Sequence, residues 1–187
     1  MKSKKSPAPE LEKGTFDYIR DPKSDCFSVG FAKTDVMPDD MDKTAYYVAG
    51  YRMNNPAKGV LDPMTASAVW IDDLSGRGGV VFVSIDDIGR TNYDVGIIRD
   101  LLADFKKESG CRSINIMSIH NHASIDTVGL WGPLPRSGRN KKYMKLLAQK
   151  VKQVVFDAYN DRRDGDLYYG KKEAEAIQRD SRLPEVY

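Results

Sequence analysis

Residues 66–85, ASAVWIDDLSGRGGVVFVSI, decide the fold class of this chain. Two apolar runs, Ala66 to Ile71 and Val80 to Ile85, have the length and composition of β-strands. The segment between them is polar and carries glycine at positions 76, 78 and 79, which is typical of a hairpin turn. The stretch therefore predicts two neighbouring strands of one sheet.

Two helices are expected after these strands. Ile98, Leu101, Leu102 and Phe105 recur at helical spacing, so a helix is predicted to begin near Asn92 and to end before Gly110. A second helix is predicted from 141 to 159. Its core face consists of Tyr143, Leu146, Leu147, Val151, Val154, Val155 and Ala158.

Shorter strands complete the pattern. Residues 27–31 alternate between apolar and polar or small side chains, and residues 114–119 form an apolar strand that ends at His120. Residues 45–51 are a strand or an ordered loop, and residues 167–169 are expected to add one more strand. Strands that alternate with helices predict an α/β fold, a mixed sheet with helices packed on it in a single domain. Residues 1–25 are charged and proline-containing and are expected to be a flexible leader, with the domain over 26–187.

Composition excludes several classes of protein. The 29 Lys and Arg residues nearly cancel the 27 Asp and Glu residues, and a net charge of +2 gives no reason to expect a nucleic-acid partner. No apolar run approaches the roughly 20 residues that span a membrane, and the first residues lack the apolar centre of a signal peptide. Cys26 and Cys111 imply no disulfide framework and are interpreted as half-buried thiols.

The two histidines of the chain lie two residues apart in the segment 118–124, SIHNHAS. Side chains at i and i+2 point to the same side of an extended backbone, so His120 and His122 can converge on one ion at the end of a strand. Neutral imidazole is a favoured zinc ligand, but a catalytic zinc site normally takes three protein ligands. Asp126, Asp86 and Asp87 are candidates for the missing ligands, or these lie outside the chain.

Three segments resemble the amino-terminal domain of neutral (non-lysosomal) ceramidases. The first is VGFAKTD at 29–35, which is similar to the opening strand of that family. The second is AVWIDD at 68–73 with VVFVSID at 80–86, which resembles its paired strands before an acidic turn. The third and most specific is SIHNHAS at 118–124, which resembles the family's Thr-His-Thr-His-Ser stretch, with Asn121 in place of a threonine.

The resemblance implies a zinc-dependent hydrolase that cleaves N-acyl sphingoid lipids, ceramide to sphingosine and a fatty acid, in an extracellular or cell-surface setting. It makes His120 a zinc ligand, His122 a catalytic residue beside the metal, and Arg179 a catalytic residue, with Arg182 as the rival arginine. The family's further ligands (a His, a Glu and a Tyr) and its serine nucleophile lie farther downstream. The chain is therefore expected to be a truncated part of a larger catalytic domain, inactive without the remaining part.

Two other interpretations stay open. One is a non-catalytic binding domain that keeps the fold without the site, and the other is a different metallohydrolase that uses the His-x-His pair. The metallo-β-lactamase pattern His-x-His-x-Asp-His is not met, because Ser124 and Ile125 occupy the Asp and His positions. Trp131 either lines a lipid-binding cleft or packs under its loop. The basic run 136–142 is either a peripheral membrane contact or a solvated helix start.

Overall fold

The computed structural model describes residues 26–168 and 170–173. The leader predicted at 1–25, and Arg179 and Arg182, lie outside these described residues. Five strands form one sheet in the order β4-β3-β2-β1-β5. They are β1 (Phe27–Asp35), β2 (Thr65–Asp72), β3 (Val80–Ile85), β4 (Ser113–Ser118) and β5 (Arg163–Gly165). The helices are α1 (Asn92–Leu101), α2 (Ala103–Ser109) and α3 (Lys141–Asn160).

The sheet is mixed, as predicted. Strands β2 and β3 are joined by the glycine turn and pair antiparallel, with Ala68 opposite Val83. Strands β3 and β4 pair parallel, and the chain between them forms α1 and α2. Strand β1 pairs antiparallel with both β2 and β5. A mixed sheet covered by helices confirms the predicted α/β class.

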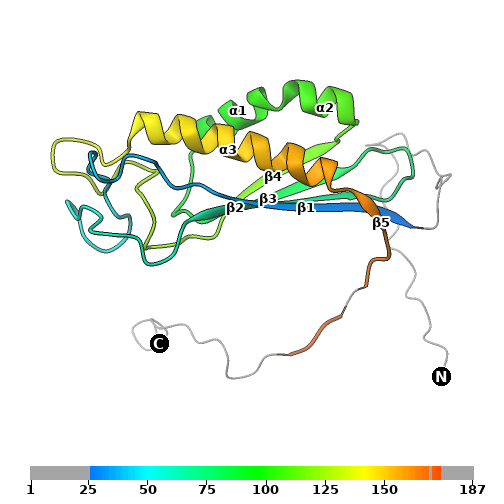
Figure 1. Cartoon of the computed structure of the whole chain (residues 1–187), viewed down its shortest axis with the longest axis horizontal. Helices are drawn as coiled ribbons and strands as arrows, with labels where there is room; N and C mark the ends of the chain where they lie inside the picture. Colours follow the sequence, from blue (N-terminus) through cyan, green and yellow to red (C-terminus); the bar gives the residue numbers. More distant parts are fainter. Residues whose placement is uncertain (1–25, 169, 174–187) are drawn as a thin grey trace, which may run out of the picture.

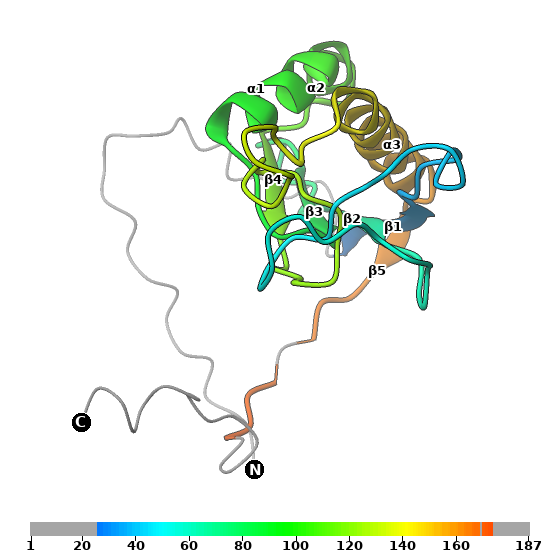
Figure 2. The ribbon, with the colours of Figure 1, turned by 90° about the vertical axis from the view of Figure 1, so that its left-hand side faces the viewer.

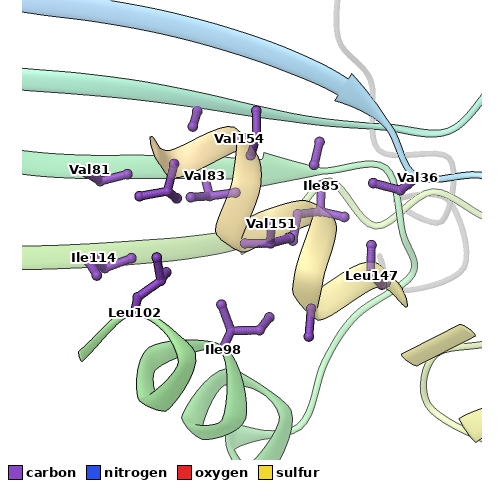
Figure 3. Close-up of a cluster of buried hydrophobic side chains, with 14 of the residues drawn as sticks. Val36, Val81, Val83, Ile85, Ile98, Leu102, Ile114, Leu147, Val151 and Val154 are labelled. Carbon is purple, nitrogen blue, oxygen red and sulfur yellow. The ribbon is translucent and has the colours of Figure 1, made fainter. Parts of the chain in front are cut away.

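All three helices pack on one face of the sheet (Figures 1 and 2). Alternate strand residues point toward them, so Ala66, Ala68 and Trp70 of β2 and Val81, Val83 and Ile85 of β3 are buried. Figure 3 shows this core, in which Leu147, Val151 and Val154 of α3 and Ile98 and Leu102 meet the strand side chains. Helix α3 lies very close to β1 at Gly30, where a Cβ atom would stand 2.0 Å from the carbonyl oxygen of Ala158. Only glycine fits at that position.

The opposite face of the sheet is not covered by any helix of the described residues (Figure 1). Phe31, Val69 and Phe82 are neighbours across β1, β2 and β3 on that face. Phe31 is 53% exposed, Phe82 41% and Met117 of β4 47%. Three large apolar side chains are therefore left in contact with solvent.

Two elements differ from the prediction. The helix expected from Asn92 is interrupted at Leu102, which caps α1 with a non-helical ψ of 10°. The apolar spacing continues across the break because Leu102 and Phe105 are both buried, so periodicity alone does not reveal it. The last strand is β5 at Arg163–Gly165, and Leu167 and Tyr168 are exposed instead of paired. This short edge strand is held by backbone pairing with β1 and has no apolar pattern.

Residues 45–51 are an ordered loop, held by isolated bridges of Tyr47 to Pro56 and of Val48 to Ile125. The helix at 141–160 and the strand at 113–118 lie within one residue of the predicted bounds. No helix in the described part of the chain combines the length and apolarity needed to cross a bilayer.

Candidate active site

The topology brings the candidate residues to one end of the sheet. Strands β1, β3 and β4 run in the same direction, so the loops that leave their carboxyl ends gather at one edge. These loops, residues 36–64, 86–91 and 119–140, lie together at the left of Figure 1. The histidine segment follows β4 directly, at an edge where open α/β sheets commonly hold ligands.

The two imidazole rings lie against each other. Nε2 of His120 is 3.1 Å from Nε2 of His122, and the ring centroids are 4.7 Å apart at an interplanar angle of 74°. His120 is exposed and His122 is half-buried. Two nitrogen atoms that face one site from different residues form a potential pair of metal ligands.

The rings do not meet in the predicted way. The strand ends at Ser118, and His120 has a φ of 63°, in the left-handed region, so the backbone is not extended between the histidines. The main-chain N–H groups of Ile119 and Asn121 donate to the carbonyl groups of Ile85 and Asp87. Through these bonds the chain stays paired with the segment after β3 beyond the end of β4. The two rings meet because the backbone turns at His120, and not because side chains at i and i+2 of a strand share a face.

Each ring has a distinct environment on its second nitrogen. Nδ1 of His120 is 2.7 Å from the carbonyl oxygen of Ile88. A carbonyl only accepts hydrogen bonds, so Nδ1 of His120 carries the proton and its Nε2 has the free lone pair in the neutral ring. Nδ1 of His122 is buried and has no hydrogen-bond partner in the described residues. The hydrogen bond between the rings then runs from Nε2 of His122 to Nε2 of His120.

The loop at Gly50 closes the other side of His122. Tyr51 lies over the His122 ring with centroids 4.9 Å apart, and its side chain is 89% exposed. Gly50 has a φ of 129°, and a Cβ atom there would stand 2.9 Å from the Cβ of His122. Trp131 donates from its indole nitrogen to the carbonyl of Gly50 at 2.6 Å. Trp131 therefore ties two loops together, in agreement with packing under its loop.

The three aspartates predicted as further ligands are engaged in other contacts. Asp126 is buried and accepts hydrogen bonds from the main chain of Val128, Gly129 and Trp131. Asp86 accepts from the main chain and hydroxyl of Thr65 at 2.8 and 2.6 Å.

Asp87 forms a buried ion pair with Arg90, and burial raises the pKa of the Asp87 carboxyl group. No group of three or more His, Cys, Asp or Glu side chains that could hold a metal exists among residues 26–168 and 170–173. The described residues therefore offer the two imidazoles without a complete set of zinc ligands.

The basic run at 136–142 is partly neutralised. Arg139 pairs with Asp94, and Lys142 pairs with Asp39 and Asp40. Arg136 and Lys141 remain exposed. Two of the four basic side chains of this helix start therefore form ion pairs, and the other two face solvent.

A cavity of about 460 Å³ lies beside the site. Its apolar walls include Met37, Met41 and Met64, and Asn121 and Ala123 contribute from the histidine segment. The imidazoles of His120 and His122 do not line it. The cavity is therefore separate from the space between the rings.

Sequence reasoning identified the histidines but missed the groups that orient them. These are the carbonyl of Ile88, Gly50 and the ring of Tyr51. They are 32 to 72 positions away from the histidines that they contact, and a main-chain carbonyl leaves no residue-type signal. The positive φ of Gly50 is the one feature that residue type hints at, but glycine occurs at 15 positions of the chain.

No protein-family model matches the chain, and no curated protein sequence aligns with it. Solved structures do share its fold. A ceramidase complexed with C2 aligns with a TM-score of 0.57 at 12% identity, over 74% of this chain and 22% of that one. The neutral ceramidase from Pseudomonas aeruginosa aligns with the same TM-score and coverage at 14% identity. The chain therefore spans about a fifth of these ceramidases and has the fold of one part of them.

Proposed function

We propose that this chain is the amino-terminal part of a zinc-dependent amide hydrolase that cleaves N-acyl sphingoid lipids, with ceramide giving sphingosine and a fatty acid. The single observation that carries the proposal is the 3.1 Å separation of the two Nε2 atoms of His120 and His122. The fold shared with part of the neutral ceramidases supports the reaction class.

The geometry of the histidine pair fits a zinc ion on His120 with His122 beside it. A zinc ion would lie about 2.0–2.1 Å from Nε2 of His120. Nε2 of His122, 3.1 Å from that nitrogen, would then lie next to the metal. His120 also donates from Nδ1 to a carbonyl, which is the usual support of a zinc-bound histidine. A bound zinc ion would polarise the amide carbonyl and lower the pKa of a water molecule to about 7.

The two histidines have different roles in this proposal. His120 is the metal ligand, because its Nε2 lone pair is fixed by the bond from Nδ1 to Ile88. His122 is the catalytic histidine, which exchanges a proton through Nε2 near the reacting atoms. Arg179 is proposed as a second catalytic residue on the ceramidase resemblance, and it lies outside the described residues.

The remaining ligands are proposed to come from a further part of the catalytic domain. The uncovered sheet face, with Phe31, Phe82 and Met117 exposed, is a surface on which such a part would pack. A lipid amide would approach the histidines past the exposed side chains of Tyr51 and Ile119. We also propose contact with a membrane surface and an extracellular or cell-surface setting, in line with such a substrate and with the resemblance.

A cobalt titration of the purified chain tests the metal site. Visible absorption and imidazole NMR signals report ligation of Co²⁺, which accepts the same nitrogen ligands as zinc. We expect weak binding that perturbs both rings, together with loss of binding in His120→Ala. A chain whose two histidine signals are unaffected by millimolar cobalt would contradict the proposal.

An amidase assay tests the reaction. A fluorescent ceramide should remain intact with the 187-residue chain alone. It should be cleaved by a catalytic domain that contains this chain together with the proposed further ligands, and His122→Ala should abolish that cleavage. Full activity of the His122→Ala variant would instead support a non-catalytic role for the pair.

A further inference from the structure

The carbonyl that orients His120 belongs to the loop 87–90, which is held by side-chain and main-chain contacts. Ile88 is buried, and the residues around it make hydrogen bonds or ion pairs. Thr127 donates from its hydroxyl to the carbonyl of Gly89 at 2.6 Å. Asp87 and Arg90 form an ion pair with side chains only 1% and 3% exposed. The short segment 87–90 is therefore held by three of its four residues.

Asp87 also contacts the histidine segment directly. Its main-chain carbonyl accepts a hydrogen bond from the N–H of Asn121 at 3.0 Å. Burial raises the pKa of its carboxyl group, and the side chain of Ser118 is close enough to that group to lower this pKa in part. Ser118 and Asn121 flank His120 on either side along the chain. Asp87 thus connects the loop that presents the Ile88 carbonyl to the backbone that carries the ring.

This ion pair is not expected to add much to the free energy of unfolding. Removing two charges from water costs several kcal/mol per ion, which the attraction offsets only when the remaining polar atoms are paired. Here Oδ1 of Asp87 and Nε of Arg90 are buried without hydrogen-bond partners in the described residues. Apolar side chains of similar volume often stabilise a core at least as well, so packing alone does not account for the pair.

We propose that Asp87 and Arg90 are positioning residues that hold His120 with its proton on Nδ1 and its Nε2 lone pair toward His122. The ion pair fixes the loop, the loop presents the Ile88 carbonyl, and the carbonyl selects the tautomer. The tautomer part of this inference stands on the structure alone, whereas its consequence for metal binding rests on the proposed function.

The test compares the wild type with a double variant, Asp87→Leu with Arg90→Met. This variant removes both charges and keeps the volume, so it is expected to fold. Arg90→Lys keeps the charge and should retain the wild-type behaviour. Asp73→Asn, in the more exposed ion pair with Arg77 at the hairpin, is the matched control.

Nitrogen-15 imidazole NMR at pH 8 reads the tautomer without any metal. We expect the wild type, Arg90→Lys and Asp73→Asn to carry the His120 proton on Nδ1, and the double variant to lose this preference. A wild-type ring with its proton on Nε2 overturns the inference, even if the variants fail to fold. An unchanged tautomer in a folded double variant also overturns it.

Cobalt titration separates this inference from the proposed function. Loss of support around a metal-bound histidine typically costs 10- to 100-fold in affinity, so the double variant should bind cobalt at least about tenfold more weakly. If the wild type binds no cobalt but shows the expected tautomer, and the double variant loses it, the proposed zinc site fails and the positioning role stands. If the double variant binds cobalt as the wild type does, the positioning role is refuted and the metal site stands.

Discussion

Replacing Gly50 by alanine tests whether the loop over His122 is shaped by backbone strain. Gly50 has a φ of 129°, a region that side-chain-bearing residues rarely enter and that costs about 1–3 kcal/mol. The added Cβ would also stand 2.9 Å from the Cβ of His122, 3.0 Å from its Nδ1 and 3.0 Å from its carbonyl oxygen. These contacts are too short, so His122 must shift by a few tenths of an ångström. Together the two effects predict a loss of about 2–4 kcal/mol in the free energy of unfolding.

Urea unfolding measures this loss. With a slope of about 2 kcal/mol per molar urea, the midpoint of Gly50→Ala should fall by about 1–2 M. Gly59→Ala is the control, because no atom lies within 4 Å of the position its Cβ would take, and its free energy should change by less than about 0.5 kcal/mol. Imidazole NMR should show a shifted His122 signal in Gly50→Ala alone. The reasoning is refuted if Gly50→Ala unfolds at the wild-type midpoint with an unchanged His122 signal.

Three further predictions concern positions away from the histidine rings. Gly96 lies in α1 and its added Cβ would meet open space, so Gly96→Ala should raise the free energy of unfolding by about 0.5–1 kcal/mol in the same urea experiment. Asp126→Asn should lower it by about 2–4 kcal/mol, because an amide cannot accept from all three main-chain N–H groups that Asp126 binds, and wild-type stability would contradict this. Hydrogen bonds from Lys142 and Tyr46 lower the pKa of Asp40 from 3.8 to about 2. Its carboxylate therefore stabilises the fold above about pH 3.8, and this contribution is lost as pH falls through about 2. The melting temperature of Asp40→Asn should lie below that of the wild type at pH 6, and the gap should narrow between pH 4 and pH 2.

The helices and longer strands could be predicted because the spacing of their apolar side chains shows which face of each element is buried. Helix α3 matches the predicted range to one residue, since seven of its apolar side chains recur at the spacing of a helix face and six of these are buried. The β2–β3 hairpin follows equally from two apolar runs around three glycines. Strand β5 could not be found in this way. Arg163 and Asp164 pair with β1 through main-chain groups, which any residue type provides.

In the candidate site, too, residue types could be predicted from the sequence and contacts made by the fold could not. A His-x-His pair after an apolar strand is visible in the sequence, and the structure brings the two rings together. The extended geometry predicted for the pair is wrong, because the chain leaves the strand at Ser118 and turns at His120. The engagement of Asp86, Asp87 and Asp126 could not be predicted, since residue type does not show that each carboxylate contacts protein groups, namely Thr65, Arg90 and the main chain of Trp131.

The similarity to ceramidases therefore says less about the chemistry of the histidine pair than the contacts of the two rings do. At 12–14% identity a shared fold fixes the path of the backbone and leaves the identity of most side chains open. What distinguishes a ligand pair from two adjacent surface histidines is the state of their four ring nitrogens. In this chain the bond to Ile88 leaves Nε2 of His120 as the acceptor, and His122 has no partner on Nδ1. A histidine pair with both second nitrogens free in water would have no preferred tautomer, and its ability to hold a metal would have to be created at each binding event. The proposed role of His120 therefore depends more on the carbonyl of buried Ile88, next to a buried ion pair, than on the fold as a whole.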